Sequence, residues 1–171
     1  IWQGGMSFHG GLLGVCLATY IFTKKYNLNF FRYTDLVSLA APIGIFLGRV
    51  ANFINSELYG RETDFIFSVN FNKVDNLFRH PSQLYEALFE GLILFALLTY
   101  YRKKYHNKNA YGLITGLFLI YYGIFRTLIE FLREPDTHLG LLFNFITMGQ
   151  LLSIPLIFIG VIIFYKNNND K

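Results

Sequence analysis

Five long apolar blocks, separated by short polar connections, constrain the fold of this chain most strongly. They run approximately from Phe8 to Phe22, Leu36 to Ile54, Leu84 to Tyr101, Tyr111 to Leu132 and Ile146 to Tyr165. A helix that crosses the hydrocarbon core of a bilayer needs about 20 residues, with a lower limit of roughly 17. The composition, 53% hydrophobic and 15% charged, also differs from that of an ordinary soluble domain. The sequence therefore predicts an all-α polytopic membrane protein with about five transmembrane helices.

The basic residues between the blocks predict the orientation of the helices. One alternate set of connections holds Lys24, Lys25, Arg32, Arg102, Lys103, Lys104, Lys108, Lys166 and Lys171, and the other holds Arg61, Lys73, Arg79 and Arg133. Because cytoplasmic loops carry the excess of Lys and Arg, residues 23–35, residues 102–110 and the C-terminal tail are expected in the cytoplasm. The N-terminal segment, residues 55–83 and residues 133–145 are expected outside.

The long connection at residues 55–83 is expected to form a small outward-facing head. Within it the residues alternate in a period-two pattern that favours a short strand, with Phe65, Phe67, Val69 and Phe71 on one side and Ile66, Ser68, Asn70 and Asn72 on the other. The predicted organisation is a single transmembrane domain at residues 1–165, which carries this head between its second and third helices, followed by a cytoplasmic tail at residues 166–171.

Composition also excludes some classes of function. The single cysteine, Cys16, cannot form an internal disulfide, and no Cys/His cluster has the spacing of metal ligands. The net charge of +4 is not spread as a nucleic-acid-binding surface would be. Neither a metal site nor a nucleic-acid partner is therefore expected.

Arg49 lies in an apolar block, where a charge is costly and usually functional. Asn52 and Asn55 follow it at three-residue spacing, so the three side chains share one helical face. That face is predicted to point into the helical bundle. Two structural alternatives stay open, namely a polar network that only fixes packing and a guanidinium that reaches the outer interface.

Arg126 lies in the fourth block, with Tyr122 and Glu130 at four-residue spacing on the same stripe. Glu130 could simply neutralise Arg126 within the helix. Glu86 and Glu90 share a face of the third block and could complement arginines on neighbouring helices. For these two glutamates, both buried charge pairing that fixes packing and a catalytic role stay open.

His9 lies at the predicted outward end of the first block, among the glycines of GGMSFHGG (residues 4–11). Glycine allows the close approach of a backbone or a ligand, which is compatible with a functional histidine. The structural alternative is an interfacial histidine bonded to a carbonyl group, with glycines that serve only helix packing.

Five strings of this sequence together resemble bacterial prolipoprotein diacylglyceryl transferase. They are GGMSFHGGLLG (4–14), GRVANFINSELYGRET (48–63), HPSQLYEALFEG (80–91), YGIFRTLIEFLREPD (122–136) and MGQLLSIP (148–155). The strings occur in the order of the family and run through nearly the whole chain. The proteins of this family are longer, so the chain is expected to lack their N-terminal part, which contributes another tyrosine and further helices. Ala51 stands where the family usually has glycine.

The resemblance implies a transferase of the bacterial cytoplasmic membrane that acts toward the outer side. Such an enzyme moves the diacylglyceryl group of phosphatidylglycerol to the lipobox cysteine of a prolipoprotein, forming a thioether and releasing glycerol phosphate. The residues implied as catalytic are His9, Tyr122, Arg126 and Glu130, and those implied to bind phosphatidylglycerol are Arg49, Asn52, Glu57 and Gly60.

The chemistry expected of these residues needs no metal or organic cofactor. His9 would accept the thiol proton, because a free thiol with a pKa near 8.5 is mostly protonated at neutral pH. Arg49 and Arg126 would bind the phosphate with forked donors, and Asn52 would add a neutral donor.

The remaining implied residues would position these groups. Glu57 and Glu130 would hold the arginines in orientation, and Gly60 would allow close approach of backbone or substrate. A transporter and a non-catalytic lipid-binding scaffold are the alternatives, although the sequence shows no internal repeat of the kind many transporters have.

Overall fold

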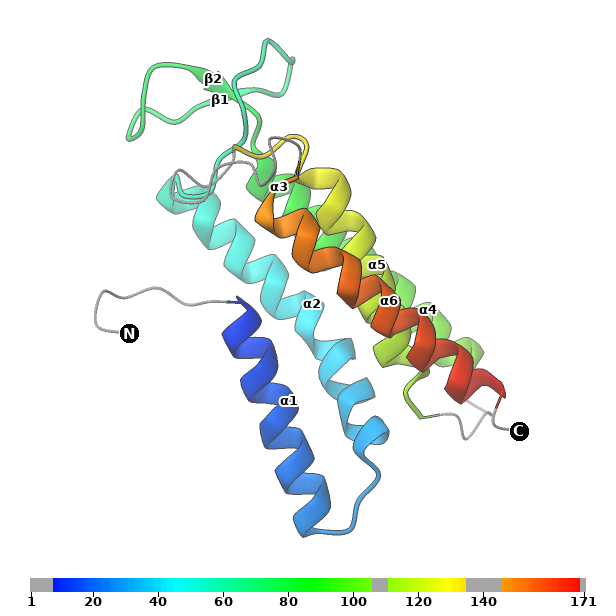
Figure 1. Cartoon of the computed structure of the whole chain (residues 1–171). Helices are drawn as coiled ribbons and strands as arrows, with labels where there is room; N and C mark the ends of the chain where they lie inside the picture. Colours follow the sequence, from blue (N-terminus) through cyan, green and yellow to red (C-terminus); the bar gives the residue numbers. More distant parts are fainter. Residues whose placement is uncertain (1–7, 106–110, 135–145, 170–171) are drawn as a thin grey trace.

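Each predicted apolar block forms a helix. The computed structural model describes residues 8–105, 111–134 and 146–169. The elements are α1 (Phe8–Lys25), α2 (Phe30–Asn55), β1 (Val69–Asn70), β2 (Phe78–Arg79), α3 (Ser82–Glu86), the π-helical segment η1 (Ala87–Ile93), α4 (Leu94–Lys104), α5 (Leu113–Ile129) and α6 (Met148–Asn169). The segments α3, η1 and α4 follow one another without a break and form one continuous rod (Figure 1).

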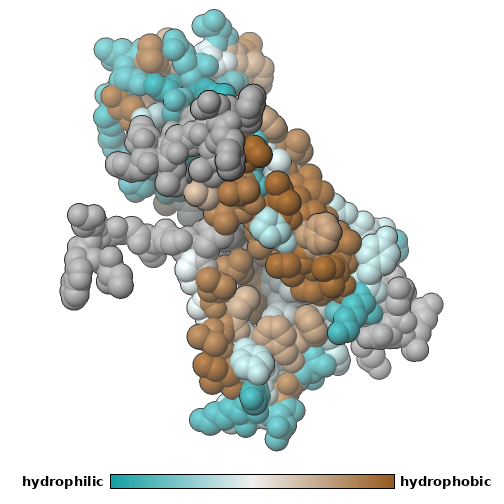
Figure 2. Space-filling view, viewed as in Figure 1, coloured by the Kyte–Doolittle hydropathy of each residue, from teal (hydrophilic) through white to brown (hydrophobic). Residues whose placement is uncertain are grey.

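Three of the described helices are long and apolar enough to cross a membrane. They are Phe30–Asn55 with 26 residues, Ser82–Lys104 with 23 and Met148–Asn167 with 20, while Leu113–Ile129 is apolar but shorter. Hydrophobic side chains cover the middle of the bundle, and hydrophilic ones gather at its two ends (Figure 2). The protein is therefore mostly helical with several apolar helices, as predicted for an all-α membrane protein.

Most of the contacts between helices involve α2 or α5. Among the described elements α1 packs only on α2, whereas α2 also packs on the rod and on α5, and α6 packs along α5 (Figure 1). The backbones of α5 and α6 approach closely where Gly116 faces Gly160, since a Cβ on Gly116 would lie 2.9 Å from the Gly160 carbonyl oxygen. Small residues permit this kind of approach between membrane helices.

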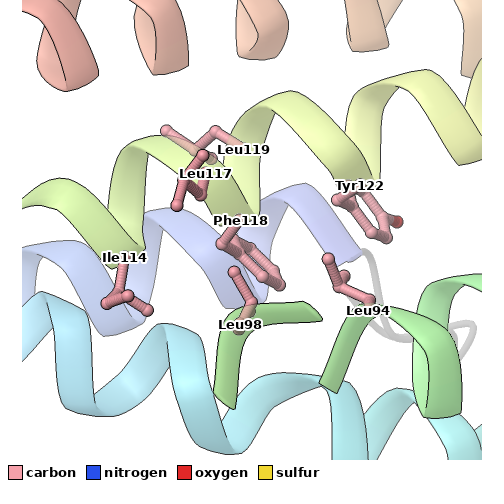
Figure 3. Packing of buried hydrophobic residues seen from close by; sticks show 7 residues of the cluster. All are labelled: Leu94, Leu98, Ile114, Leu117, Phe118, Leu119 and Tyr122. Carbon is pink, nitrogen blue, oxygen red and sulfur yellow. The ribbon is translucent and has the colours of Figure 1, made fainter. Parts of the chain in front are cut away.

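The hydrophobic core lies between α4 and α5. Its buried members are Leu94, Leu98, Ile114, Leu117, Phe118, Leu119 and Tyr122 (Figure 3). Tyr122 lies at the end of this row nearest the end of α5, so the apolar core and the polar face of α5 meet at this side chain.

Asp35 ties α2 to the start of α5. Its carboxylate accepts hydrogen bonds from the backbone N–H groups of Gly112 and Thr115, both at 2.7 Å, and from the Thr115 hydroxyl at 2.7 Å. The first N–H groups of a helix have no partner within it, so Asp35 caps α5 from a neighbouring helix. This contact fixes how far α5 extends along α2, and thus where the other end of α5 lies.

Residues 56–81 form the head, which lies at the other end of the bundle (Figure 1). The strands β1 and β2 pair antiparallel, with Val69 opposite Arg79 and Asn70 opposite Phe78. The predicted strand is confirmed only in its second half, because Phe65 and Ser68 close a turn through a 2.8 Å backbone hydrogen bond. Arg79 joins the head to the segment after α5, with ion pairs to Asp75 at 2.7 Å and Glu134 at 3.4 Å.

Candidate functional site

Three arginines and three glutamates meet below the head, inside the bundle. We call Arg49, Glu86, Glu90, Arg126, Glu130 and Arg133 the Arg–Glu cluster. They come from α2, α3, η1, the end of α5 and the segment that follows it. Exposure of these six side chains ranges from 0% to 17%. The cluster is therefore a nearly dry site built by segments far apart in the sequence.

Glu86 lies at the centre of the Arg–Glu cluster. Arg49 Nε is 3.1 Å from Glu86 Oε2, and Arg133 Nη1 is 3.7 Å from Glu86 Oε1. Arg126 Nη1 also donates a hydrogen bond to Oε1. One planar carboxylate thus lies among three guanidinium groups, which shows that these arginines converge on a single oxyanion-sized position.

Glu90 and Glu130 occupy the edges of the cluster. Glu90 lies 3.5 Å from Arg49 Nη2 and 3.8 Å from Arg126 Nη1, and Glu130 lies 2.9 Å from Arg126 Nη2. The predicted pair within α5 is therefore confirmed, but Arg126 also contacts two glutamates of the rod. The prediction that Glu86 and Glu90 complement arginines of neighbouring helices is likewise confirmed.

The start of α6 covers Glu130. A Cβ added to Gly149 would lie 2.7 Å from the carboxylate carbon of Glu130, so a larger residue there would displace this carboxylate. The same turn is fixed by a capping box, in which Thr147 and Gln150 exchange hydrogen bonds of 3.2 and 3.3 Å between backbone N–H and side chain. Gly149 and Gln150, in the motif at residues 148–155, therefore both have a structural role at the start of α6.

The rod changes from α-helix to π-helix where it supplies its carboxylates. Glu86 is the last residue of α3, and Glu90 lies within the seven residues of η1. Short π-helical segments are rare and frequently occur at functional sites. The π-helical segment η1 therefore coincides with the Arg–Glu cluster.

The formal charges of the cluster cancel when all six groups are ionised. Buried charges are costly unless they are paired, and the three carboxylates provide that pairing. The Arg49 side chain is 17% exposed and turns toward Glu86 and Glu90, which excludes the alternative in which it reaches for the interface. The forked donors of arginine suit carboxylate or phosphate oxygens, so the cluster can bind an anion if one of its carboxylates moves away from the arginines.

Several predicted site residues lie together. Arg49, Arg126 and Glu130 belong to the cluster. Tyr122 is 4% exposed, packs its ring on Phe118 at 5.7 Å between centroids, and lies close enough to Glu90 to interact electrostatically. The stripe predicted on α5 is therefore confirmed as one buried face.

The predicted inward face of α2 is only partly correct. Asn52 is half-buried one turn after Arg49, but Asn55 is exposed. Asn55 is the last residue of α2, where the helix ends beside the head. The polar face therefore points inward at Arg49 and turns to the surface at Asn55.

Glu57 and Gly60 lie in the head rather than in the cluster. The Glu57 side chain is exposed, and among the described residues no ion pair joins it to an arginine. In the described part of the structure Glu86 and Glu90 make ion pairs with Arg49 and Arg126, and the expected part of Glu57 in orienting an arginine stays a prediction. A Cβ on Gly60 would lie 2.5 Å from the His80 carbonyl oxygen, so Gly60 allows the approach of backbone within the head.

His9 can be placed only by its backbone. It lies in the first turn of α1, and its side chain is outside the described part of the structure. The helices α1 and α2 run antiparallel from a shared turn (Figure 1). At 1.5 Å per residue in both helices, the first turn of α1 comes level with about residue 47 of α2, which is close to Arg49.

Arg133 was missed as a site residue. It was assigned to an outer connection, yet its side chain is 7% exposed and faces Glu86. Its backbone forms a bridge with Gly60, and its carbonyl oxygen accepts a 3.0 Å hydrogen bond from Arg61 Nε. The sequence signal that could have found it is its position one turn beyond Glu130 on an otherwise apolar stretch.

Buried polar residues fasten the head to the rod beside the cluster. Gln83 is 0% exposed and donates a 2.6 Å hydrogen bond from Nε2 to the Glu57 carbonyl oxygen. Ser82 donates a 3.0 Å bond to the Leu58 carbonyl oxygen. These contacts explain why SQ follows HP in the third motif.

An apolar groove runs beside the cluster, between the rod and α5. We call it the lateral groove; it has a volume of about 430 Å³ and is lined by Phe65, His80, Tyr85, Phe89, Phe125, Leu128, Ile129 and Leu132. Most of these residues directly precede a member of the cluster, as Tyr85 precedes Glu86 and Phe125 precedes Arg126. Its size is that of a small-molecule site.

No metal-binding arrangement is found within residues 8–105, 111–134 and 146–169, where no group of three or more His, Cys, Asp and Glu side chains has suitable geometry. The described site offers the guanidinium groups of arginines, carboxylates and the buried phenol of Tyr122.

Comparison with known proteins gives a consistent result. Residues 1–166 match the family model of prolipoprotein diacylglyceryl transferase. Among curated relatives, phosphatidylglycerol–prolipoprotein diacylglyceryl transferase of Rickettsia felis is 51% identical over 167 residues, which are 98% of this chain and 64% of that protein. The Rickettsia bellii protein of the same name is 52% identical over 96% of this chain and 63% of its own length. The chain thus spans somewhat less than two thirds of these relatives.

Proposed function

Because this chain belongs to the prolipoprotein diacylglyceryl transferase family, we propose that it transfers the diacylglyceryl group of phosphatidylglycerol to a prolipoprotein. The acceptor is the thiol of the lipobox cysteine, the bond formed is a thioether, and the leaving group is glycerol phosphate. The observation that carries the proposal is the convergence of Arg49, Arg126 and Arg133 on the single carboxylate of Glu86.

In this proposal the Arg–Glu cluster binds the phosphodiester. The sulfur attacks the glycerol carbon that bears the phosphate, the carbon–oxygen bond breaks, and the electron pair leaves with glycerol phosphate. Arg49 and Arg126 donate hydrogen bonds to phosphate oxygens, whose charge grows in the transition state. Charge stabilisation of this kind in a poorly hydrated site is often the largest contribution to catalysis.

Other residues prepare the nucleophile and shape the site. His9 accepts the proton of the cysteine thiol, and Asn52 donates a neutral hydrogen bond to the headgroup. Glu130 orients Arg126, at the 2.9 Å distance already present, and Tyr122 closes the buried side of the cluster. Glu57 and Gly60 shape the head above it, where Gly60 keeps backbone segments together.

The lateral groove accepts one acyl chain of the lipid. It is apolar and about 430 Å³ in volume, and most of its lining residues directly precede a member of the cluster in the sequence. A lipid whose phosphate lies at the arginines has its acyl chains within reach of these side chains. A charged pocket beside an apolar groove suits an anionic diacyl lipid better than a small water-soluble anion.

The proposed setting is the bacterial cytoplasmic membrane, with five spans, the head outside and the cluster in the outward half. Residues 1–165 form one transmembrane domain and residues 166–171 a cytoplasmic tail. The distribution of Lys and Arg among the connections supports this orientation. It brings the cluster to the side where a prolipoprotein cysteine emerges from the membrane.

A transfer assay tests the proposal. The protein is reconstituted with phosphatidylglycerol and a peptide that carries a lipobox cysteine, and the thioether-linked product is measured by mass spectrometry. The Rickettsia felis relative serves as the positive control. Product from this chain supports the enzyme, whereas solute flux across vesicles or lipid binding without product, while the relative is active, would contradict it.

Arg126 supplies the sharper test within the same assay. Arg126→Ala removes the guanidinium, and Arg126→Lys keeps the charge but loses the fork, so both are expected to abolish transfer. Arg102→Ala, at the far end of the rod, is the matched control and keeps normal transfer. Near-normal turnover in a folded Arg126→Lys protein would refute the phosphate-binding role.

A further inference from the structure

Glu90 is the carboxylate that the Arg–Glu cluster holds least firmly. Its side chain is 0% exposed, and within the described residues neither of its oxygens has a hydrogen-bond partner. Its contacts with guanidinium nitrogens are 3.5 and 3.8 Å long. Glu86, by contrast, accepts a hydrogen bond from Arg126, and Glu130 lies 2.9 Å from the same arginine.

The groups that face Glu90 come from every element around it. Arg49 faces it from α2, Glu86 from α3, Tyr122 and Arg126 from α5, and Arg133 from the segment after α5. Burial disfavours the ionised carboxylate most and the neighbouring Glu86 also disfavours it, while the three arginines favour it. The ionised form of Glu90 therefore depends on attraction from guanidinium groups that make no hydrogen bond to it.

An anionic headgroup changes the charge of this site. With three arginines and three ionised glutamates the cluster is neutral, so a bound phosphodiester leaves one uncompensated negative charge. Such a charge in a poorly hydrated interior costs several kcal/mol or more. The same phosphate also draws the guanidinium groups of Arg49 and Arg126 to itself, which removes the attraction that keeps Glu90 ionised.

We propose that Glu90 takes up one proton when an anionic phosphodiester lipid binds in the Arg–Glu cluster. The proton cancels the added charge, and the neutral carboxyl group leaves both arginines to the phosphate. Glu90 is thus a positioning residue that couples lipid binding to proton uptake. The inference rests on the proposed function only in placing the phosphodiester at the cluster.

Calorimetry measures this proton directly. The protein in detergent is titrated with dihexanoylphosphatidylglycerol, without any peptide acceptor, in two buffers of different ionisation enthalpy from about pH 6 to about pH 9. The difference between the two binding enthalpies gives the number of protons taken up. We expect close to one proton per lipid at the maximum, and an affinity that falls about tenfold per pH unit while that uptake persists.

Variants assign the proton to Glu90. Glu90→Gln is neutral and similar in shape, so it is expected to bind the lipid with no proton uptake and no dependence on pH. Glu134→Gln, which removes a surface carboxylate paired with Arg79, keeps the uptake of the unaltered protein. Dihexanoylglycerol, which has the same chains and no phosphate, is expected to bring no proton.

Two results would overturn the inference. One is zero uptake by the unaltered protein across the whole pH range, a result that does not depend on whether a variant folds. The other is unchanged uptake in Glu90→Gln. Transferase activity is measured separately. Proton uptake without product would refute the transferase activity and leave the role of Glu90 standing. Product without proton uptake would refute the role of Glu90 and support the transferase activity.

Discussion

The carboxylate of Glu86 lies among the guanidinium groups of Arg49, Arg126 and Arg133, and its side chain is fully buried. A carboxylate in this position neutralises more than one neighbour, so its removal leaves uncompensated positive charge in the bundle. Breaking a buried pair from one side costs about 3–5 kcal/mol. Glu86 is therefore the residue on which the integrity of the cluster depends most.

Glu86→Gln is expected to lower the free energy of unfolding by about 3–5 kcal/mol and to abolish transfer. Denaturant unfolding in detergent measures the first effect and the thioether assay the second. Glu62→Gln, on an exposed side chain of the head, provides the matched control and should change neither. A Glu86→Gln protein within about 1 kcal/mol of the unaltered one would show that the ion pairs are weak.

Asp75 makes the head sensitive to acid. Its carboxylate accepts hydrogen bonds from the Arg79 side chain, at 2.7 Å, and from the backbone N–H of Leu77, at 3.1 Å. These bonds, that of Arg79 first, hold the pKa of Asp75 below its usual value of 3.8. The stabilisation is therefore complete above pH 3.8 and is lost as the pH falls below it.

The expected consequence is a head that pepsin cleaves faster as the pH is lowered through this range. Asp75→Asn abolishes the contribution, so cleavage within residues 56–81 should be fast throughout and should lack the pH dependence that protonation of Asp75 causes. Asp64→Asn, on an exposed neighbour, corrects for the pH dependence of pepsin itself. Identical cleavage profiles for the two variants would contradict the role of Asp75.

At the scale of elements, the lateral groove depends on the spacing of the rod and α5. Phe89 of η1 and Phe125 of α5 pack against each other in its wall, with ring centroids 5.7 Å apart. Both side chains line the groove, and a larger ring at either position would fill part of its volume. The groove should therefore set which acyl chains the protein accepts.

Phe125→Trp is expected to lower kcat/KM for long-chain phosphatidylglycerol about tenfold or more relative to the dihexanoyl lipid, since small changes in an apolar pocket have effects of this size. The ratio of the two values is the measurement, because it cancels a general loss of activity. Leu151→Trp, on an exposed position of α6, is the control. An unchanged ratio for Phe125→Trp would show that the acyl chain lies elsewhere.

The helices themselves could be predicted because each depends on its own sequence. A run of about 20 apolar residues is sufficient to indicate a membrane helix; every predicted block forms a helix, and three of the described helices are long and apolar enough to cross a membrane. The π-helical turn at η1 could not be predicted, since nothing in ALFEGLI differs from an ordinary helix pattern. The turn at Phe65 was also missed, because the alternation that predicts a strand continues through it.

At the scale of the whole molecule, the site depends on contacts between helices that no local pattern specifies. Spacing within one helix correctly predicted that Tyr122, Arg126 and Glu130 share a face. It could not show that Glu86, 40 residues before Arg126, is the group that Arg126 binds most closely. Arg133 is buried where its backbone pairs with Gly60 of the head, a contact that the pattern of a single segment cannot predict.

The family assignment rests on the whole chain, although the chain spans only 64% of the Rickettsia felis relative. The five strings that carried the resemblance lie in different elements, and the structure brings four of them to the cluster or its walls. The described part of the first string, residues 8–14, lies in α1, whose first turn comes level with about residue 47 of α2. Four of the five motifs therefore contribute residues to a single site.

The position of the bound phosphate tests the central claim most directly. A cryo-electron microscopy or crystal structure with dihexanoylphosphatidylglycerol is predicted to show phosphate oxygens about 3 Å from guanidinium nitrogens of both Arg49 and Arg126. Glu90 would then lie farther from these arginines than in the present structure. A phosphate bound at Arg79 of the head or at the basic end of α4, with the ion pairs of Glu86 and Glu90 unchanged, would contradict the account.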